Sequence, residues 1–170
     1  EIKTGKKINI VAVSAKNKNK KRKFKINKKI FYSNPFQIFN QKIDILFECI
    51  GLSDGISKSI VEKALIKKIH VITPNKALIS KHGDNLSLIA EKNKVNLEFE
   101  ASVGGGIPIL RTIKEGLATN RITKIHGILN GTCNYILSEM ENTKDNFKTV
   151  LNRAQLNGYA EPGNPKLDLN

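Results

Sequence analysis

Short apolar runs alternate with longer amphipathic stretches over the first part of the chain. Four runs rich in Ile, Val, Leu and Phe have the length of buried strands: residues 8–13, 43–50, 70–73 and 95–100. Two stretches between them repeat apolar residues with the period of an α-helix: residues 57–67 and 85–92. Strands that alternate with helices of about ten residues predict βαβ units, so we expect an α/β fold with a partial doubly wound, Rossmann-like parallel sheet.

The pattern changes after three consecutive glycines, Gly104 to Gly106. A helical stretch at residues 108–117 is followed by an alternating, strand-like run at 122–129 and by helical stretches from about 132 and from 145 to 155. We therefore expect two domains with a boundary at the glycines. Residues 1–105 form the first domain, and residues 106–170 begin a second, α+β domain.

The chain is strongly basic, with 29 Lys and Arg against 15 Asp and Glu and a formal net charge of +14. Much of the excess lies in one run, KNKNKKRKFKINKK, at residues 16–29. Such a run is typically a solvated surface, and the alternative is a nucleic-acid-binding module. The run has one aromatic residue, Phe24, and lacks the interleaved set expected of a base-stacking surface, so we do not expect a nucleic-acid partner.

Cysteine, histidine and hydropathy patterns exclude several classes of protein. Cys49 and Cys133 are not arranged as Cys-x-x-Cys, and the three histidines lack the spacing of metal-ligand pairs, so neither a disulfide framework nor a zinc site is indicated. No apolar run approaches the roughly eighteen residues of a membrane span. We expect a cytoplasmic protein without a membrane partner.

Residues that follow the predicted strands are candidates for ligand binding, because open parallel sheets bind ligands beyond the carboxyl ends of their strands. Lys16 follows the first strand, where a basic residue would bind the 2′-phosphate of NADP, although it could also merely open a basic loop. Gly51 follows the second strand. Asn75 and Lys76 follow the third, and a Pro-Asn turn there would hold the lysine in place for a carboxylate or a nicotinamide.

A second candidate lies where the run at 122–129 leads into the next helix. Asn130, Gly131 and Thr132 would present backbone amides and short polar groups at a helix N-terminus, which suits a small polar or anionic ligand. The same residue types are common helix caps, so a plain capped turn is an equally physical interpretation.

Four motifs together resemble those of homoserine dehydrogenases, in their order and approximate spacing. They are TPNKALISKHG (73–83), FEASVGGGIPILRTI (99–113), GILNGTCNYIL (127–137) and AQLNGYAE (154–161). The resemblance covers nearly the whole chain, most clearly from Asp44 onward. It implies an oxidoreductase that interconverts aspartate 4-semialdehyde and L-homoserine with NADP or NAD, in the biosynthesis of threonine, methionine and isoleucine. Another NAD(P)-dependent semialdehyde dehydrogenase with two domains is the alternative.

The resemblance also implies roles for individual residues. Lys76 would lie beside the nicotinamide and the substrate as a catalytic residue. The implied cofactor-binding residues are Lys16, Ile50, Gly51, Thr73, Asn75 and Lys76. The implied substrate-binding residues are Glu161, Asp168, Asn130, Gly131 and Thr132, with the register of Asp168 one residue longer than in many members. A carboxylate at Glu161 suits the ammonium group of homoserine.

The resemblance further implies a monovalent-cation site, with sodium as the expected ion, at Glu100, Val103, Gly105 and Ile107. Alternate carbonyls of an extended segment point the same way and could hold such an ion, whereas a glycine hinge is the alternative. The Gly-x-Gly-x-x-Gly turn and the acid/base lysine of the family match no segment of this sequence and are expected before Glu1 and beyond Asn170. We therefore expect residues 1–170 alone to be inactive, and the full-length enzyme to be a homodimer.

Overall fold

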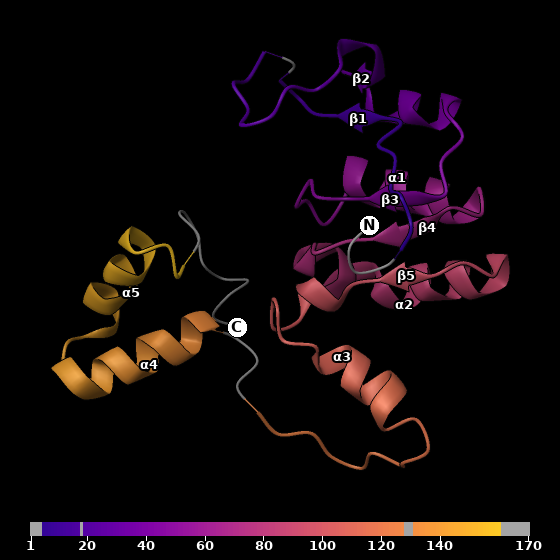
Figure 1. The fold of residues 1–170 in the computed structure, drawn as a ribbon. Helices are drawn as coiled ribbons and strands as arrows, with labels where there is room; N and C mark the ends of the chain where they lie inside the picture. The colour runs from indigo at the N-terminus through magenta and orange to yellow at the C-terminus, as the bar shows by residue number, and fades with distance from the viewer. Residues whose placement is uncertain (1–4, 18, 128–130, 161–170) are drawn as a thin grey trace.

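A computed structural model describes residues 5–17, 19–127 and 131–160. Its centre is a parallel sheet of three strands, β3 (Ile45–Phe47), β4 (His70–Ile72) and β5 (Leu97–Glu98), in that order (Figure 1). Helices α1 (Ile56–Ile66) and α2 (Lys76–Asn93) connect consecutive strands. These are the βαβ units that the alternating pattern predicts, because parallel neighbours need a crossover connection between them.

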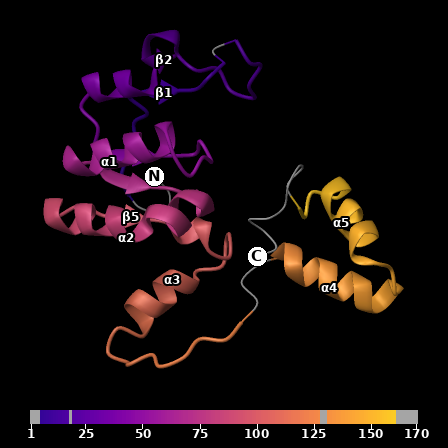
Figure 2. The same ribbon diagram turned by 180° about the vertical axis from the view of Figure 1, so that it is seen from behind.

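Both helices cover the same face of this sheet, as the view from behind shows (Figure 2). Leu46, Val71 and Leu97 are paired across the three strands and point into the core under α1 and α2. The residues before and after Leu46, Ile45 and Phe47, lie on the opposite face, where Phe47 is 60% exposed. The described part of the sheet is therefore covered on one face.

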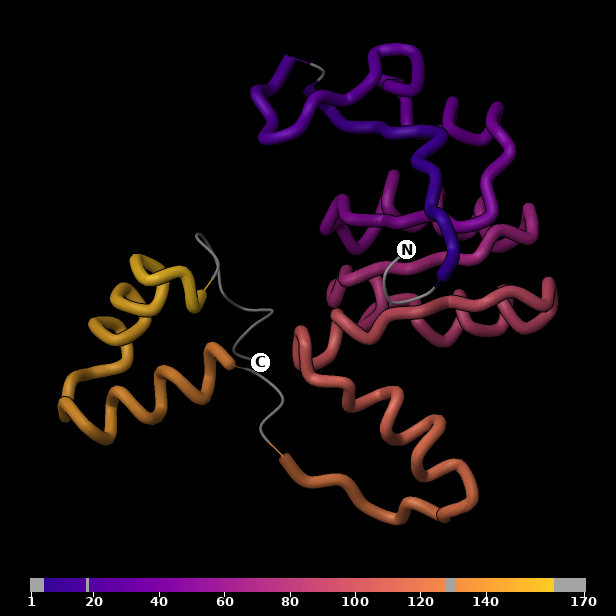
Figure 3. The backbone as a smooth tube through the Cα atoms, viewed as in Figure 1, coloured from indigo at the N-terminus to yellow at the C-terminus, as the bar shows by residue number. Residues whose placement is uncertain are grey.

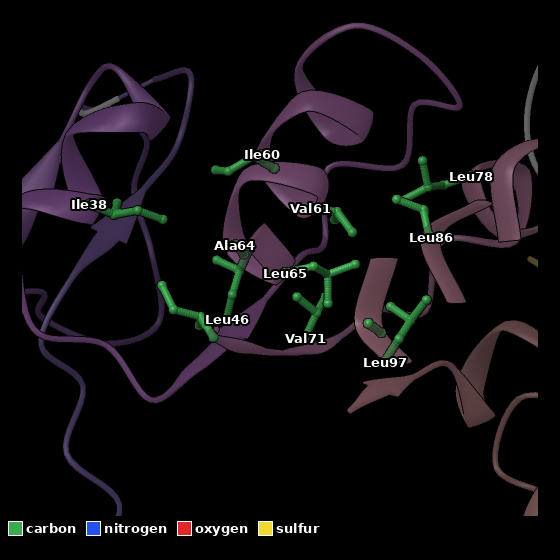
Figure 4. Packing of buried hydrophobic residues seen from close by; sticks show 12 residues of the cluster. Ile38, Leu46, Ile60, Val61, Ala64, Leu65, Val71, Leu78, Leu86 and Leu97 are labelled. Carbon is green, nitrogen blue, oxygen red and sulfur yellow. The ribbon is translucent and has the colours of Figure 1, made fainter. Parts of the chain in front are cut away.

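The core between the sheet and the helices consists almost entirely of aliphatic side chains (Figure 4). Leu65 and Val61 of α1 and Leu78 and Leu86 of α2 are completely buried. At about 25 cal/mol per Å² of apolar surface, burial of such side chains is the main term that stabilises this layer.

Helix α2 begins nine residues earlier than the sequence pattern indicates, since residues 85–92 are only its second half. Asn75 is the N-cap residue, and its side-chain oxygen accepts a hydrogen bond from the Leu78 amide (3.1 Å). Polar residues from Ser80 to Asp84 interrupt the apolar period within the helix, so the sequence pattern does not indicate its first half.

The N-terminal segment forms a separate pair of parallel strands, β1 (Val13–Ser14) and β2 (Phe31–Tyr32). The predicted strand at 8–13 is wrong over residues 8–12, which pair with no strand among the described residues and leave Ile8 and Ile10 exposed. Two short 3₁₀ helices flank β2, and their bounds are Lys28–Ile30 and Pro35–Asn40. Strand β2 was not predicted, because its two residues are too few to give a period.

The region after β5 is helical apart from one extended stretch. A 3₁₀ turn (Glu100–Ser102) precedes α3 (Ile109–Arg111), which continues as a π-helical turn (Thr112–Gly116), so the helix predicted at 108–117 is confirmed. The strand predicted at 122–129 is wrong for residues 122–127, which form no strand, while 128–129 lie outside the described residues. A strand needs a neighbour for its backbone groups, and none of the described strands lies against this stretch.

Helices α4 (Gly131–Thr143) and α5 (Phe147–Leu156) pack on each other as a hairpin, which the tube view follows from end to end (Figure 3). Ile136, Val150 and Ala154 form its buried centre. The Arg153 guanidinium joins the two helices by ion pairs with Glu139 (3.0 Å) and Asp145 (2.7 Å), which raise the pKa of Arg153 and lower that of Asp145.

Candidate functional site

Two turns meet at the carboxyl edge of the central sheet. One follows β3 and contains Ile50, Gly51 and Leu52, and the other follows β4 and contains Thr73 and Asn75. The Asn75 side-chain amide donates to the Leu52 carbonyl at 2.8 Å and so connects them. The structure therefore brings together five of the six residues predicted to bind the cofactor, namely Ile50, Gly51, Thr73, Asn75 and Lys76.

A buried carboxylate, Glu48, lies beneath these turns at the end of β3 and is only 2% exposed. The Ile50 backbone N–H donates to its Oε1 at 2.7 Å, and the Thr73 hydroxyl donates to its Oε2 at 2.6 Å. The Thr73 hydroxyl in turn accepts from the Asn75 N–H at 3.0 Å. Glu48 was not predicted as a site residue, although an acidic residue near the end of the apolar run at 43–50 was a usable signal.

Gly51 has a backbone conformation that few other residues adopt, with φ of +87°. An added Cβ would meet no atom within 4 Å, so space does not explain the glycine. Residues with a side chain rarely adopt this left-handed backbone conformation, and that preference explains the glycine. Gly51 thus allows the bend in the turn after β3, and no side chain at this position covers the backbone.

Lys76 is the first residue of α2 and is exposed. A lysine at this position opposes the helix dipole, whose N-terminal end is already positive, and such a placement typically costs about 0.3–1 kcal/mol. The helix contains no acidic residue in its first turn that would offset this cost. The fold thus places a cation at the carboxyl edge of the sheet, at a position that the helix dipole disfavours.

Asp54 joins the turn after β3 to the surface of α2. Its carboxylate accepts from Lys81 Nζ (2.7 Å) and contacts His82 Nε2 (2.9 Å). Hydrogen bonds from Lys81, then His82 and Ser53, hold the pKa of Asp54 well below its usual range. These contacts hold the outer part of the turn, while Glu48 and Asn75 hold its inner part.

Lys16 lies after β1, on the rim of an open hollow of about 650 Å³. The hollow is lined by Ala15, Lys16, Asn17, Lys20 and Arg22, none of which is acidic. The Arg22 guanidinium donates to the Asn17 and Lys20 carbonyls (2.6 and 3.0 Å) and lies 5.3 Å from the centre of the Phe31 ring. Arg22 is therefore held in place, and together with two lysines it makes the hollow suitable for an anion.

The loop at 103–107 is not the extended segment on which the geometric part of the cation-site prediction relied. Gly104 and Gly105 have positive φ values, and the Ile107 N–H donates to the Gly104 carbonyl at 3.2 Å, so the loop is a turn. The Val103 and Gly105 carbonyls accept no hydrogen bond from the described residues, which leaves both oxygens available to a cation. The Ile107 carbonyl accepts from the Ile109 N–H (2.8 Å). The Glu100 carboxylate accepts from the Leu110 and Arg111 amides, each at 2.9 Å.

The predicted substrate-binding residues are described only in part. Gly131 and Thr132 begin α4, while Asn130, Glu161 and Asp168 lie outside the described residues. The Thr132 hydroxyl donates to the Tyr159 carbonyl at 2.6 Å, and the Tyr159 ring stacks on Tyr135 with centroids 4.4 Å apart. The helix start at 131 and the segment that leads to 161 are thus adjacent. Both views show α4 apart from the central sheet (Figures 1 and 2).

Residues 5–17, 19–127 and 131–160 contain neither a candidate membrane span nor a cluster of metal-ligating side chains. None of their helices is both long and apolar enough to cross a membrane. No three His, Cys, Asp or Glu side chains are grouped there as they would be around a metal ion. Glu100 is thus the one acidic side chain of the predicted cation site, and that site would depend on backbone oxygens.

Comparison with known proteins gives a consistent result over the whole chain. Residues 1–100 match the family model described as homoserine dehydrogenase, NAD binding domain, and residues 108–170 match the one described as homoserine dehydrogenase. The homoserine dehydrogenase of Neisseria gonorrhoeae is 44% identical over 82% of this chain, and that of Bacillus subtilis is 40% identical over 91%. The aligned regions are 32% and 36% of those proteins, so the chain spans about a third of the length of the curated relatives it matches.

Solved structures give the same answer for the fold. A homoserine dehydrogenase from Thiobacillus denitrificans superposes with a TM-score of 0.75 and 41% identity, over 82% of this chain and 32% of that one. The enzyme from S. aureus superposes with a TM-score of 0.70 and 34% identity, over 95% of this chain and 38% of that one. These matches confirm the Rossmann-like fold, and they do not favour the nucleic-acid-binding module or another semialdehyde dehydrogenase.

Proposed function

This chain belongs to the homoserine dehydrogenase family, and from that premise we propose that it provides the nicotinamide side of an enzyme that interconverts L-homoserine and aspartate 4-semialdehyde. The observation that carries the proposal is the junction of the two turns at the carboxyl edge, where Asn75 joins Leu52 and is followed by Lys76. Dinucleotides bind at this edge in open parallel sheets.

The residues of this edge suit hydride transfer in several ways. When bound, the nicotinamide supplies the chemistry by accepting or donating the hydride. The backbone of Ile50 and Gly51 borders its position, and Gly51 leaves the approach open. Lys76 supplies a positive charge at the start of α2, where it can stabilise negative charge that develops on the substrate oxygen. The acid/base step is assigned to a lysine of the family that matches no residue of this sequence.

The substrate and cation sites complete the proposal. Glu161 binds the ammonium group of homoserine, with Asp168, Asn130, Gly131 and Thr132 as the other substrate-binding residues. The hydrogen bond from Thr132 to the Tyr159 carbonyl supports this grouping, because it holds the start of α4 beside the segment that leads to Glu161. A sodium ion would be held by Glu100 and by the Val103, Gly105 and Ile107 carbonyls, and the two unbonded carbonyls fit a hard cation best. We propose a homodimer as the full-length state.

Homoserine-dependent reduction of NADP⁺ by the full-length product of the gene tests the proposed function. We expect reduction to depend on L-homoserine and to be faster with added NaCl than with an equal concentration of a bulky organic cation. Turnover without preference for homoserine over other hydroxy amino acids would contradict the substrate assignment. A rate that is independent of the cation would contradict only the sodium site.

The basic hollow after β1 gives a prediction about cofactor preference. We expect Lys16→Asp to raise the ratio of KM for NADP⁺ to KM for NAD⁺ about tenfold or more, because a charge-assisted hydrogen bond to the 2′-phosphate contributes about 1.5–3 kcal/mol. Steady-state kinetics with both cofactors would measure it.

Lys25→Asp is the matched control, because it makes the same change of charge in the same basic run at a residue that does not line the hollow. An equal shift of the ratio in both variants would mean that the whole basic surface attracts the cofactor and that Lys16 has no specific contact.

A further inference from the structure

The buried carboxylate of Glu48 has no assigned role in the proposed reaction, yet it contacts both turns of the site. Its two oxygens accept from two different segments: the Ile50 N–H in the turn after β3 and the Thr73 hydroxyl at the end of β4. Asn75 Nδ2 adds a longer contact of 3.5 Å to Oε1. All three donors are neutral, and no lysine or arginine forms an ion pair with Glu48 in the described part of the chain.

A carboxylate in this position is costly for the fold, so its geometry needs an explanation. Burial of a charge is unfavourable unless hydrogen bonds replace the lost water, and here neutral donors alone do so. An apolar side chain would fill the same volume next to Leu46 and Val71 without that cost. The two oxygens of the carboxylate accept from both turns at once, which an apolar side chain cannot do.

The network extends from Glu48 to the first residue of α2. Thr73 donates to Glu48 and accepts from the Asn75 N–H, and Asn75 caps α2 through the Leu78 amide. Asn75 also holds the Leu52 carbonyl. The side chains of Thr73 and Asn75 are 1% and 5% exposed, so their polar atoms are used inside the protein. Their predicted contact with the cofactor would therefore be made mainly through the turns that they shape.

We propose that Glu48 is a positioning residue for the nicotinamide: it fixes the distance between the Gly51 turn and Lys76, and thereby the geometry of the cofactor at the carboxyl edge of the sheet. This rests on the proposed function, since it names the cofactor of that site. The expected signature is weaker productive binding of the cofactor, with the homoserine contacts on α4 and beyond left unchanged.

Glu48→Gln in the full-length enzyme is the first test. The substitution replaces one carboxylate oxygen with an NH2 donor, so one of Ile50 N–H and the Thr73 hydroxyl loses its acceptor. We expect KM for NADP⁺ to rise about tenfold, since small misplacements in a site are costly, while KM for homoserine stays within about twofold. Glu98→Gln is the matched control, because it makes the same acid-to-amide change at an exposed residue of β5 in the same sheet.

A second pair of variants tests the other end of the same hydrogen bond and serves also if Glu48→Gln does not fold. Thr73→Ser keeps the hydroxyl and Thr73→Val removes it at nearly the same volume. The proposal requires that the serine variant keeps KM for NADP⁺ near that of the wild type and that the valine variant raises it. Equal effects of serine and valine would overturn it, as would a Glu48→Gln enzyme with lower thermal stability and unchanged KM for NADP⁺.

Direct cofactor binding separates failure of this inference from failure of the proposed function. If the wild type binds NADPH but does not oxidise homoserine, the proposed function fails. The Kd for NADPH, measured by fluorescence, then decides about Glu48. A Kd that rises in Glu48→Gln and not in Glu98→Gln supports the positioning role, and a Kd equal in all three proteins overturns it.

Discussion

Replacing Lys76 with methionine is expected to lower kcat for homoserine-dependent NADP⁺ reduction by about a hundredfold or more, the typical effect of removing a preorganised electrostatic group from an active site. Methionine keeps most of the length of the side chain and removes its charge, which at the start of α2 opposes the helix dipole. Turnover should therefore fall while the enzyme keeps its fold. Steady-state kinetics and a thermal melt of the full-length enzyme measure both.

Lys92→Met is the control for this variant, since Lys92 lies in the last turn of the same helix. A lysine there favours the helix, so its loss should cost a few tenths of a kcal/mol and leave kcat within about twofold. If Lys76→Met kept kcat within about threefold of the wild type, its charge would have no part in the transition state. Lys76 would then be a surface residue.

The second large effect concerns the core under the sheet. Leu65→Ala should lower the free energy of unfolding by about 2–5 kcal/mol, because Leu65 is completely buried and the truncated side chain leaves a cavity. Figure 4 shows Leu65 beside Val71, in the layer between α1 and the strands. A whole domain is typically stable by only about 5–15 kcal/mol, so the variant should unfold at a clearly lower urea concentration.

Ile66→Ala provides the comparison in the adjacent position of α1, where the side chain is 61% exposed. We expect a change within about 0.5 kcal/mol, since the lost contacts are few and alanine favours the helix. Circular dichroism during urea titration measures both variants. If Leu65→Ala and the wild type had equal urea midpoints, the core layer that contains Leu65 would not unfold in the transition that circular dichroism detects.

The central α/β unit could be predicted from the sequence because its signals are local. Apolar runs at 43–50 and 70–73 contain β3 and β4, and the stretch at 57–67 covers all of α1 except its first residue. The predictions fail where the formation of a strand depends on a pairing partner elsewhere in the chain. Residues 8–12 and 122–127 have the composition of strands, but a strand is stable only when a neighbour pairs with its backbone groups.

The residues of the candidate site also fall into two groups: some are indicated by their position along the chain, and others have a role that depends on distant contacts. Lys76 and Gly51 were predicted as site residues because they follow predicted strands. That position can be read directly from the sequence. Glu48 was missed because its meaning depends on Thr73, which is 25 residues away in the chain. The role of Thr73 and Asn75 as internal hydrogen-bonding residues was missed for the same reason. Only the folded arrangement shows which polar groups are already used by the protein.

The order of the central strands has a consequence for how the protein assembles. Strands β3, β4 and β5 are neighbours in the sheet and also follow one another along the chain, so every crossover joins adjacent strands. Each new βα segment can therefore dock on the one made before it, and no later segment has to insert between two that are already paired. Each pairing joins residues about 25 positions apart, so it closes a shorter loop than a pairing between the ends of the chain would. The segment from β3 to β5 can thus form on the ribosome in the order of its synthesis, before α4 and α5 are made.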